Sequence, residues 1–143
     1  MVYLDTSALL KRYIPEANSE LFEAYFIAHA PASISRLGLV EIRCALSRKR
    51  RNKQITAERE KAAMNEIRTD IQDGILATYP VDDSHFAEAL HLIDQMPKVP
   101  LRSLDALHLA IARSLDTHEL ATADAVLRQA AQSLGMKVAY FGQ

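Results

Sequence analysis

Short segments typical of β-strands alternate with longer segments typical of α-helices along the chain, and no other feature limits the possible folds as strongly. Strands are expected over residues 2–4, 31–34, 75–81, 119–122 and 137–141. Each connection between consecutive strands is long enough for the crossover that parallel neighbours require. The sequence therefore predicts an α/β fold in which helices cover both faces of a parallel sheet.

The segments between these strands carry apolar residues at helical spacing. Several begin at a capping residue such as Ser35 or end at a glycine such as Gly74. Helices are expected over residues 6–15, 16–29, 35–51, 56–74, 82–95, 103–115 and 124–134. A chain of 143 residues can bury one core, and no internal repeat or interdomain linker is visible. We therefore expect a single domain that spans residues 1–143.

The composition excludes several classes of protein. The net charge is −1, with 49% hydrophobic and 24% charged residues, a balance typical of globular proteins and not of disordered chains or general polyanion binders. The single cysteine, Cys44, cannot form an internal disulfide, which is typical of a reducing compartment. No apolar run reaches the ~18 residues of a membrane helix, and no leader segment is visible. We expect a cytoplasmic protein without a membrane anchor.

Two acidic residues lie where a parallel sheet gathers functional groups, which is just beyond the carboxyl ends of its strands. Asp5 directly follows the first expected strand and Asp124 follows the fourth. A third acid, Asp105, lies in the first turn of an apolar helix. Each also has a structural interpretation. Asp5 and Asp124 are good helix N-caps, and Asp105 interacts favourably with the dipole of its own helix.

Glu41 is more informative, because the residues one helical turn away are Leu37, Gly38, Cys44 and Ala45. None of them is basic, so a carboxylate on this apolar stripe needs a partner from another element. Two partners remain possible at this point, namely a basic side chain such as Arg102 or a metal ion.

One hypothesis explains all four acids together, namely a cluster of oxygen ligands for Mg²⁺ or Mn²⁺. Zinc is disfavoured, because Cys44 is the only sulfur ligand apart from methionine and the five histidines show no metal-binding pair. His108 lies among apolar neighbours at helical spacing, so we expect a packed, structural histidine. Ser7 and Thr122, each two residues from an acid, either orient metal-bound water or make local turn hydrogen bonds.

A basic run near the end of the third expected helix is the one local candidate for phosphate contacts. The run contains Arg48, Lys49, Arg50 and Arg51. Its cations also suit the negative end of a helix dipole, and the two roles are compatible.

In order and spacing, several strings of this sequence resemble the PIN-domain ribonucleases, particularly the VapC-type toxins of toxin–antitoxin pairs. The strings are VYLDTSAL from Val2, LVEI around Glu41, LDALHLA from Leu104 and LATAD ending at Asp124. The resemblance implies a five-stranded parallel sheet with an acidic site for Mg²⁺ or Mn²⁺. Asp5, Glu41, Asp105 and Asp124 match the acidic positions of the family, and Ser7 and Thr122 match its hydroxyl positions. Ala125 departs from the basic or polar residue that often follows the last acid.

The resemblance also implies an activity and partners. It implies a metal-dependent endoribonuclease that hydrolyses RNA phosphodiester bonds, a small antitoxin whose basic side chain competes for the acidic cleft, and a homodimer. Residues 56–74 resemble the helical region that the family uses for partner contacts. The alternatives are a housekeeping RNA-processing nuclease and a non-catalytic binding module. A phosphotransferase is disfavoured, because Ser7 stands where such enzymes often carry a second aspartate.

Overall fold

In the computed structural model, which describes all 143 residues, five strands form one parallel sheet. The strands are β1 (Val2–Leu4), β2 (Ala32–Ser35), β3 (Leu76–Tyr79), β4 (Glu119–Thr122) and β5 (Lys137–Tyr140). Their order in the sheet is β3-β2-β1-β4-β5, and every neighbouring pair is parallel. The predicted α/β fold is confirmed.

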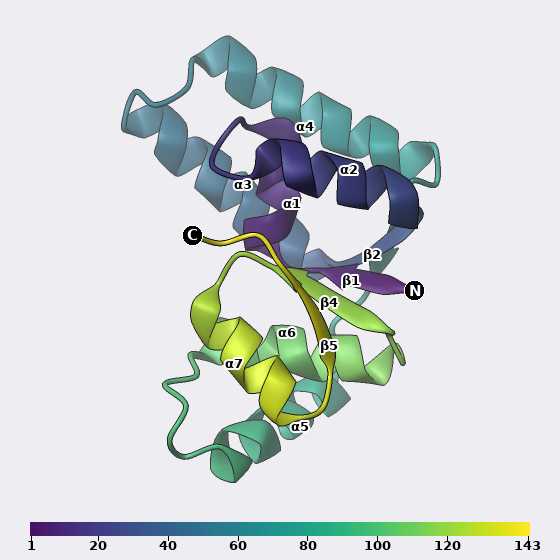
Figure 1. The fold of residues 1–143 in the computed structure, drawn as a ribbon. Coiled ribbons are helices and arrows are strands. Elements are labelled where there is room, and N and C mark those ends of the chain that lie inside the picture. The colour runs from purple at the N-terminus through teal and green to yellow at the C-terminus, as the bar shows by residue number, and fades with distance from the viewer.

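Seven helices cover the two faces of this sheet (Figure 1). On one side lie α1 (Thr6–Tyr13), α2 (Ser19–His29), α3 (Arg36–Arg51) and α4 (Ala57–Gln72). On the other side lie α5 (Asp83–Gln95), α6 (Ser103–Ser114) and α7 (Ala125–Ser133). No helix is long and apolar enough to cross a membrane.

The central strand β1 divides the buried apolar side chains between two cores. Val2 and Leu4 belong to the core under α1–α4, whereas Tyr3 belongs to the core under α5–α7. This division follows from the two-residue period of a strand, in which successive side chains point to opposite faces. Because both faces are covered, every residue of β1, β2 and β4 is buried, including the polar residues of β2 and β4.

The expected element boundaries differ most at α2, which begins at Ser19 and not at Glu16. Asn18 precedes it in the left-handed backbone conformation, with φ 67°, which no residue of a continuing right-handed helix adopts. Its side-chain amide donates to the carbonyl oxygens of Phe141 and Gly142, at 3.0 and 3.1 Å. The turn is therefore set by a contact with the far end of the chain.

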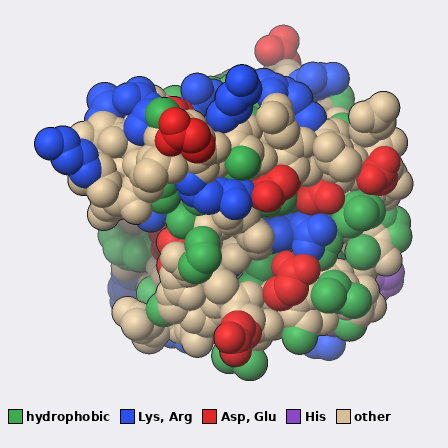
Figure 2. Space-filling model, turned by 90° about the horizontal axis from the view of Figure 1, so that it is seen from above, with side chains coloured by type: hydrophobic (Ala, Val, Ile, Leu, Met, Phe, Trp, Pro, Cys, Tyr) green, Lys and Arg blue, Asp and Glu red, His purple; other side chains and the backbone are tan.

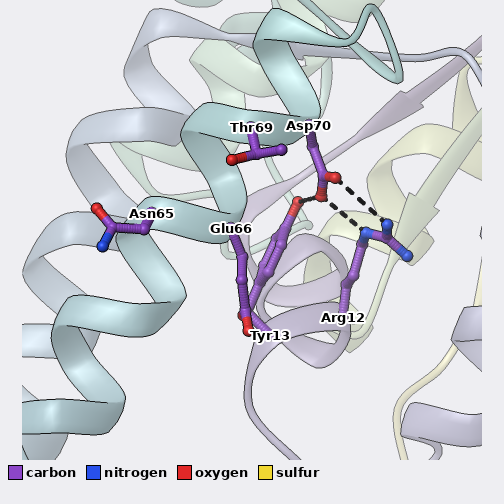
Figure 3. A pocket seen from close by; sticks show the side chains of 6 residues that line it. All are labelled: Arg12, Tyr13, Asn65, Glu66, Thr69 and Asp70. Atoms are coloured by element: carbon purple, nitrogen blue, oxygen red, sulfur yellow. Dashed lines mark hydrogen bonds and ion pairs between the residues drawn. The ribbon is translucent and has the colours of Figure 1, made fainter.

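A buried ion pair fastens α4 to α1 (Figure 3). Asp70, which is 8% exposed, accepts hydrogen bonds from the Tyr13 hydroxyl at 2.6 Å and from Arg12 Nε at 3.0 Å. The Arg12 guanidinium also lies over the ring of Phe26, 4.3 Å from its centroid. Burial and the hydrogen bond to Asp70 raise the pKa of Tyr13, so its hydroxyl stays a proton donor.

We expect the substitution D70A to lower the free energy of unfolding by about 2–4 kcal/mol, because it leaves the Tyr13 hydroxyl and part of the Arg12 charge buried without a partner. The matched control is E66A on the same helix, which removes only the ion pair with Arg59. That pair is well exposed, so its loss should cost less than about 1 kcal/mol. Urea denaturation followed by circular dichroism measures both, and equal losses would contradict the assignment.

Candidate active site

The strand order places a functional edge between β1 and β4. From β1 the chain continues to β2 on one side, whereas from β4 it continues to β5 on the other side. At such a switch point the connecting loops diverge and leave a crevice beyond the carboxyl ends of the two strands. Asp5 follows β1 and Asp124 lies two residues after β4, so both acids lie at this crevice.

All four predicted acids line one cleft of about 400 Å³ at this edge, although they come from four different elements. The cleft is lined by Asp5, Thr6, Ser7, Leu10, Glu16, Glu41, Ala45, Arg48, Arg102, Asp105, His108, Ala123 and Asp124. Glu41, Ala45 and Arg48 are spaced at i, i+4 and i+7 along α3 and present one face of that helix to the cleft.

Asp5 is the most buried of the four acids, with 5% of its surface exposed. It accepts hydrogen bonds from the backbone N–H of Ala8 at 2.9 Å, from the Thr122 hydroxyl at 2.7 Å and from the Ser7 hydroxyl at 2.8 Å. Burial raises the pKa of Asp5, and these hydrogen bonds only partly offset the effect. The predicted N-cap is thus present, and the same carboxylate also lines the cleft.

Ser7 and Thr122 join the turn after β1 to the turn after β4. Besides donating to Asp5, the Thr122 hydroxyl accepts from the backbone N–H of Asp124 at 2.9 Å. The Ser7 hydroxyl accepts from the backbone N–H of Ala123, also at 2.9 Å. Both hydroxyls therefore make local turn hydrogen bonds and at the same time fix the orientation of the Asp5 carboxylate.

The partner of Glu41 is His108, a contact that sequence reasoning missed. His108 is buried, with 3% exposure, as expected. However, its Nε2 lies 2.5 Å from Glu41 Oε1 and its Nδ1 lies 2.7 Å from the Tyr3 hydroxyl. The buried, structural position of His108 is therefore as expected, but its contact with Glu41 was not predicted, and Arg102 is not the partner of Glu41. The available signal was the spacing of His108 three residues after Asp105, which places both on one face of α6.

The electrostatics of Glu41 differ from those of Asp5. Burial alone would raise the pKa of Glu41, but the hydrogen bond and charge of His108, together with the hydrogen bond from Thr6 at 2.8 Å, outweigh it and lower the pKa. Glu41 is therefore held ionised, whereas the ionised form of Asp5 is disfavoured by its burial.

Asp105 and Asp124 share one cation, Arg102. Its Nε lies 3.4 Å from Asp105 Oδ2 and its Nη2 lies 3.2 Å from Asp124 Oδ2. The other oxygen of Asp124 accepts from the backbone N–H groups of Val126 and Leu127 and caps α7, as expected. The two acids are thus linked through a side chain that is 75% exposed.

The donor set fits a hard divalent cation by its chemistry, because carboxylate oxygens select Mg²⁺ or Mn²⁺. Asp5 adds a physical reason, since a nearby cation would offset the cost of its buried charge, which its raised pKa reflects. However, no three acidic, histidine or cysteine side chains converge closely enough to hold one ion. Glu41 contacts His108, and Asp124 contacts α7 and Arg102. A shared ion therefore requires some of these side chains to turn from their present partners.

The residues of the basic run at the end of α3 have different partners in the structure. Arg48 lines the cleft and makes no ion pair, whereas Lys49 lies 3.8 Å from Glu16 and Arg50 lies 2.6 Å from Glu60. Arg51 donates to the hydroxyl of Ser47 at 2.8 Å. Figure 2 shows many Lys and Arg side chains along the part of the surface that α3 and α4 form. Within the run, Arg48 is the side chain that reaches the acidic site.

Comparison with known sequences assigns the family. The family model described as the PIN domain matches residues 2–133. Ribonuclease VapC46 of Mycobacterium tuberculosis is 31% identical over 139 residues, which cover 96% of this chain and 95% of that protein. Ribonuclease VapC45 of the same species is 32% identical over 141 residues, with 97% and 94% covered. The chain belongs to the PIN-domain family, and the resemblance to VapC-type proteins is confirmed.

Solved structures agree on the fold. The crystal structure of M. tuberculosis VapC20, described as a sarcin-ricin loop cleaving toxin, has a TM-score of 0.71 and 16% identity and covers 91% of this chain and 95% of its own. FitAcB from Neisseria gonorrhoeae has a TM-score of 0.71 and 18% identity, with 96% of each chain covered. VapBC2 from Rickettsia felis, bound to a promoter DNA fragment, has a TM-score of 0.68 and 13% identity and covers 98% of each chain. At this identity the likeness establishes the fold alone.

The raised pKa of Asp5 makes a prediction for the pH dependence of stability. A carboxyl group with a raised folded-state pKa contributes stability that is fully present below its ordinary value of 3.8 and is lost as the pH rises through the raised value. We expect D5N to remove this loss, so that the variant gains stability relative to the native chain as the pH rises.

The measurement is urea denaturation of both proteins across the acidic to neutral range, with EDTA present. D94N, a change at an exposed acid on α5, serves as the control and should follow the native profile. A constant difference between D5N and the native chain at all pH values would contradict the prediction.

Proposed function

We propose that the protein is a metal-dependent endoribonuclease that hydrolyses RNA phosphodiester bonds and acts as the toxin of a toxin–antitoxin pair. One observation carries the proposal. Four carboxylates from separate elements line one cleft at the carboxyl edge of a PIN-domain sheet, in a chain 31% identical to a VapC ribonuclease over 96% of its length.

Asp5, Glu41, Asp105 and Asp124 are the residues we assign to a Mg²⁺ or Mn²⁺ site. A divalent ion held there supplies Lewis-acid chemistry, because it lowers the pKa of a coordinated water and neutralises charge on the phosphate. The chain itself preorganises two of the acids, Asp5 and Glu41, and Glu41 is held by Thr6 and His108. Asp5 is held by Ser7, Thr122 and the N-terminus of α1, so its carboxylate keeps one orientation without further ordering.

Hydrolysis in this site is an in-line attack of water on phosphorus. The bond to the 3′ oxygen of the leaving nucleotide breaks, a proton reaches that oxygen, and the products carry 5′-phosphate and 3′-hydroxyl ends. Glu41 and Asp124 are the two candidates to accept the proton of the attacking water. His108 holds Glu41 in place, so we assign it a positioning role and not contact with the substrate.

We expect D105N and D5N each to lower RNA cleavage by at least about 100-fold, because each removes a charged oxygen ligand from the site. D94N, which changes an exposed aspartate on α5, should keep native activity. Cleavage is measured on total cellular RNA with Mn²⁺ or EDTA, and sequencing of the 5′ ends reports the position of each cut. Metal-independent cleavage, or full activity of D105N with its fold intact, would rule out this site assignment.

We further propose that Arg48 binds a phosphate of the RNA strand next to the scissile bond. Arg48 makes no ion pair and lies on the same face of α3 as Glu41, two helical turns further along the helix. Lys49, Arg50 and Arg51, which also belong to the predicted basic run, engage Glu16, Glu60 and Ser47. For these three residues a direct phosphate contact stays a prediction.

Loss of one phosphate contact should lessen the salt dependence of RNA binding. In a D105N background, which suppresses cleavage, we expect R48Q to reduce the slope of log affinity against log salt concentration by about 0.7. R68Q removes the same charge from an exposed arginine on α4, outside the basic run, and serves as the matched control. Fluorescence anisotropy with a labelled single-stranded RNA measures both slopes, and identical slopes for R48Q and the parent would contradict the role of Arg48.

An antitoxin is the protein partner that this proposal includes. The structures of FitAB and VapBC2, which share the fold, are each described as bound to a DNA fragment. A basic antitoxin side chain competing for the acidic cleft is compatible with its four carboxylates. The homodimer and the partner role of residues 56–74 stay predictions.

Two alternatives remain testable by simple observations. A housekeeping nuclease would lack an adjacent short gene for a DNA-binding antitoxin, and its expression alone would not slow growth. A non-catalytic binding module would cleave no RNA at any Mn²⁺ concentration.

A further inference from the structure

Arg102 makes contacts that differ from those of the other cation at the cleft. Arg48 has no carboxylate partner, whereas the Arg102 guanidinium bridges Asp105 on α6 and Asp124 before α7. Arg102 is the residue that precedes α6, and it follows the loop between α5 and α6 that contains Pro97 and Pro100. Its backbone N–H also points to Asp105 Oδ2, at 3.4 Å. The side chain thus reaches into the site from the rim of the cleft.

Arg102 contacts the one oxygen of Asp124 that remains free for a divalent ion. Asp124 Oδ1 is already engaged by two backbone N–H groups of α7, at 2.8 and 3.0 Å. Only Oδ2 of this carboxylate remains for a further ligand, and Arg102 Nη2 lies 3.2 Å from it. The same guanidinium lies 3.4 Å from Asp105 Oδ2 and leaves the other oxygen of Asp105 without a hydrogen bond. An ion that takes Asp105 and Asp124 as ligands therefore competes with Arg102 for Asp124 Oδ2, and it also competes with the guanidinium charge for the Asp105 carboxylate.

The contacts of Arg102 are weak enough to be exchanged. They are longer than the usual 2.7–2.9 Å of charge-assisted hydrogen bonds, and the side chain is 75% exposed. Exposed ion pairs contribute little and are readily replaced by stronger electrostatic partners. After leaving the two carboxylates, the guanidinium stays tethered at the rim of the cleft. A phosphate group is a suitable new partner, because the planar guanidinium can donate two parallel hydrogen bonds to its oxygens.

We propose that Arg102 is an exchangeable internal cation, which competes with the divalent ion for Asp105 and Asp124 and, once displaced, binds a phosphate of the RNA strand. This inference rests on the proposed metal-dependent nuclease function. It predicts opposite effects of one substitution, since removing Arg102 should strengthen binding of the metal ion and weaken binding of the nucleic acid. A residue that merely supports the local structure would weaken both kinds of binding when it is removed.

The first arm of the test measures Mn²⁺ binding to the full-length protein by electron paramagnetic resonance of the free ion. We expect R102Q to bind Mn²⁺ about two- to five-fold more tightly than the native chain, which corresponds to the loss of an exposed ion pair. R113Q is the matched control. Arg113 lies on the same helix and makes an exposed ion pair with Glu88, which is not part of the cleft, so its removal should leave Mn²⁺ affinity unchanged.

The second arm measures binding of a labelled single-stranded DNA oligonucleotide at saturating Mn²⁺, and denaturing gel electrophoresis checks that the strand stays intact. We expect R102Q to bind this strand about ten-fold more weakly, R102K to recover part of the loss, and R113Q to match the native chain. R102A serves as a second variant in both arms, with thermal denaturation as the check that each protein is folded.

The outcomes separate the inference from the function on which it rests. The proposed metal site itself fails if the native chain binds no Mn²⁺, or if D105N does not abolish the Mn²⁺ binding of the native chain. If D105N abolishes binding but R102Q and R102A leave Mn²⁺ affinity unchanged or weaken it, the exchange is refuted and the metal site stands. Tighter Mn²⁺ binding without loss of strand binding refutes the phosphate contact alone.

Discussion

The hydrogen-bonded carboxylate of Asp5 is the constraint on which the site depends. It stands at the end of the central strand, caps α1 through Ala8, and accepts from Thr122 at the end of β4. One carboxylate thus connects the end of β1 with the end of β4, its neighbour in the sheet. Because the connections diverge at this point, the crevice opens where the two strands are fastened together.

This arrangement makes the same residues serve both the fold and the chemistry. A buried carboxylate stabilises the turn by accepting hydrogen bonds, yet burial raises its pKa and disfavours its charge. Glu41 shows the opposite solution, since His108 and Thr6 lower its pKa and keep it ionised. The α5–α7 side supplies His108 and the α1–α4 side supplies Glu41, so the pair can form only when both layers pack on the sheet.

The sequence was sufficient to predict the sheet and to place Asp5 and Asp124 at its edge, because strand ends can be read from short apolar runs and parallel strands bring their carboxyl ends to one edge. Glu41 and Asp105 lie on helices, and it was the resemblance to the PIN-domain ribonucleases that joined them to the same site. The partners of the acids could not be predicted in this way. Whether His108 packs or binds Glu41, and whether Arg102 contacts Glu41 or Asp105 and Asp124, depends on which helix faces meet across the sheet. The late start of α2 has the same cause, since Asn18 bonds to residues more than 120 positions away.

The charge balance of the cleft follows from these partners. Arg102 and the hydrogen bonds of His108 offset much of the repulsion among the four acids, so the chain can fold with all four lining one cleft. However, the two kinds of compensation differ in strength. His108 is buried and linked to Tyr3 and Ser35, whereas Arg102 is exposed and makes longer contacts. The charge of Glu41 is therefore compensated by a buried, fixed partner. The charges of Asp105 and Asp124 are compensated by an exposed side chain that a divalent cation can displace more easily.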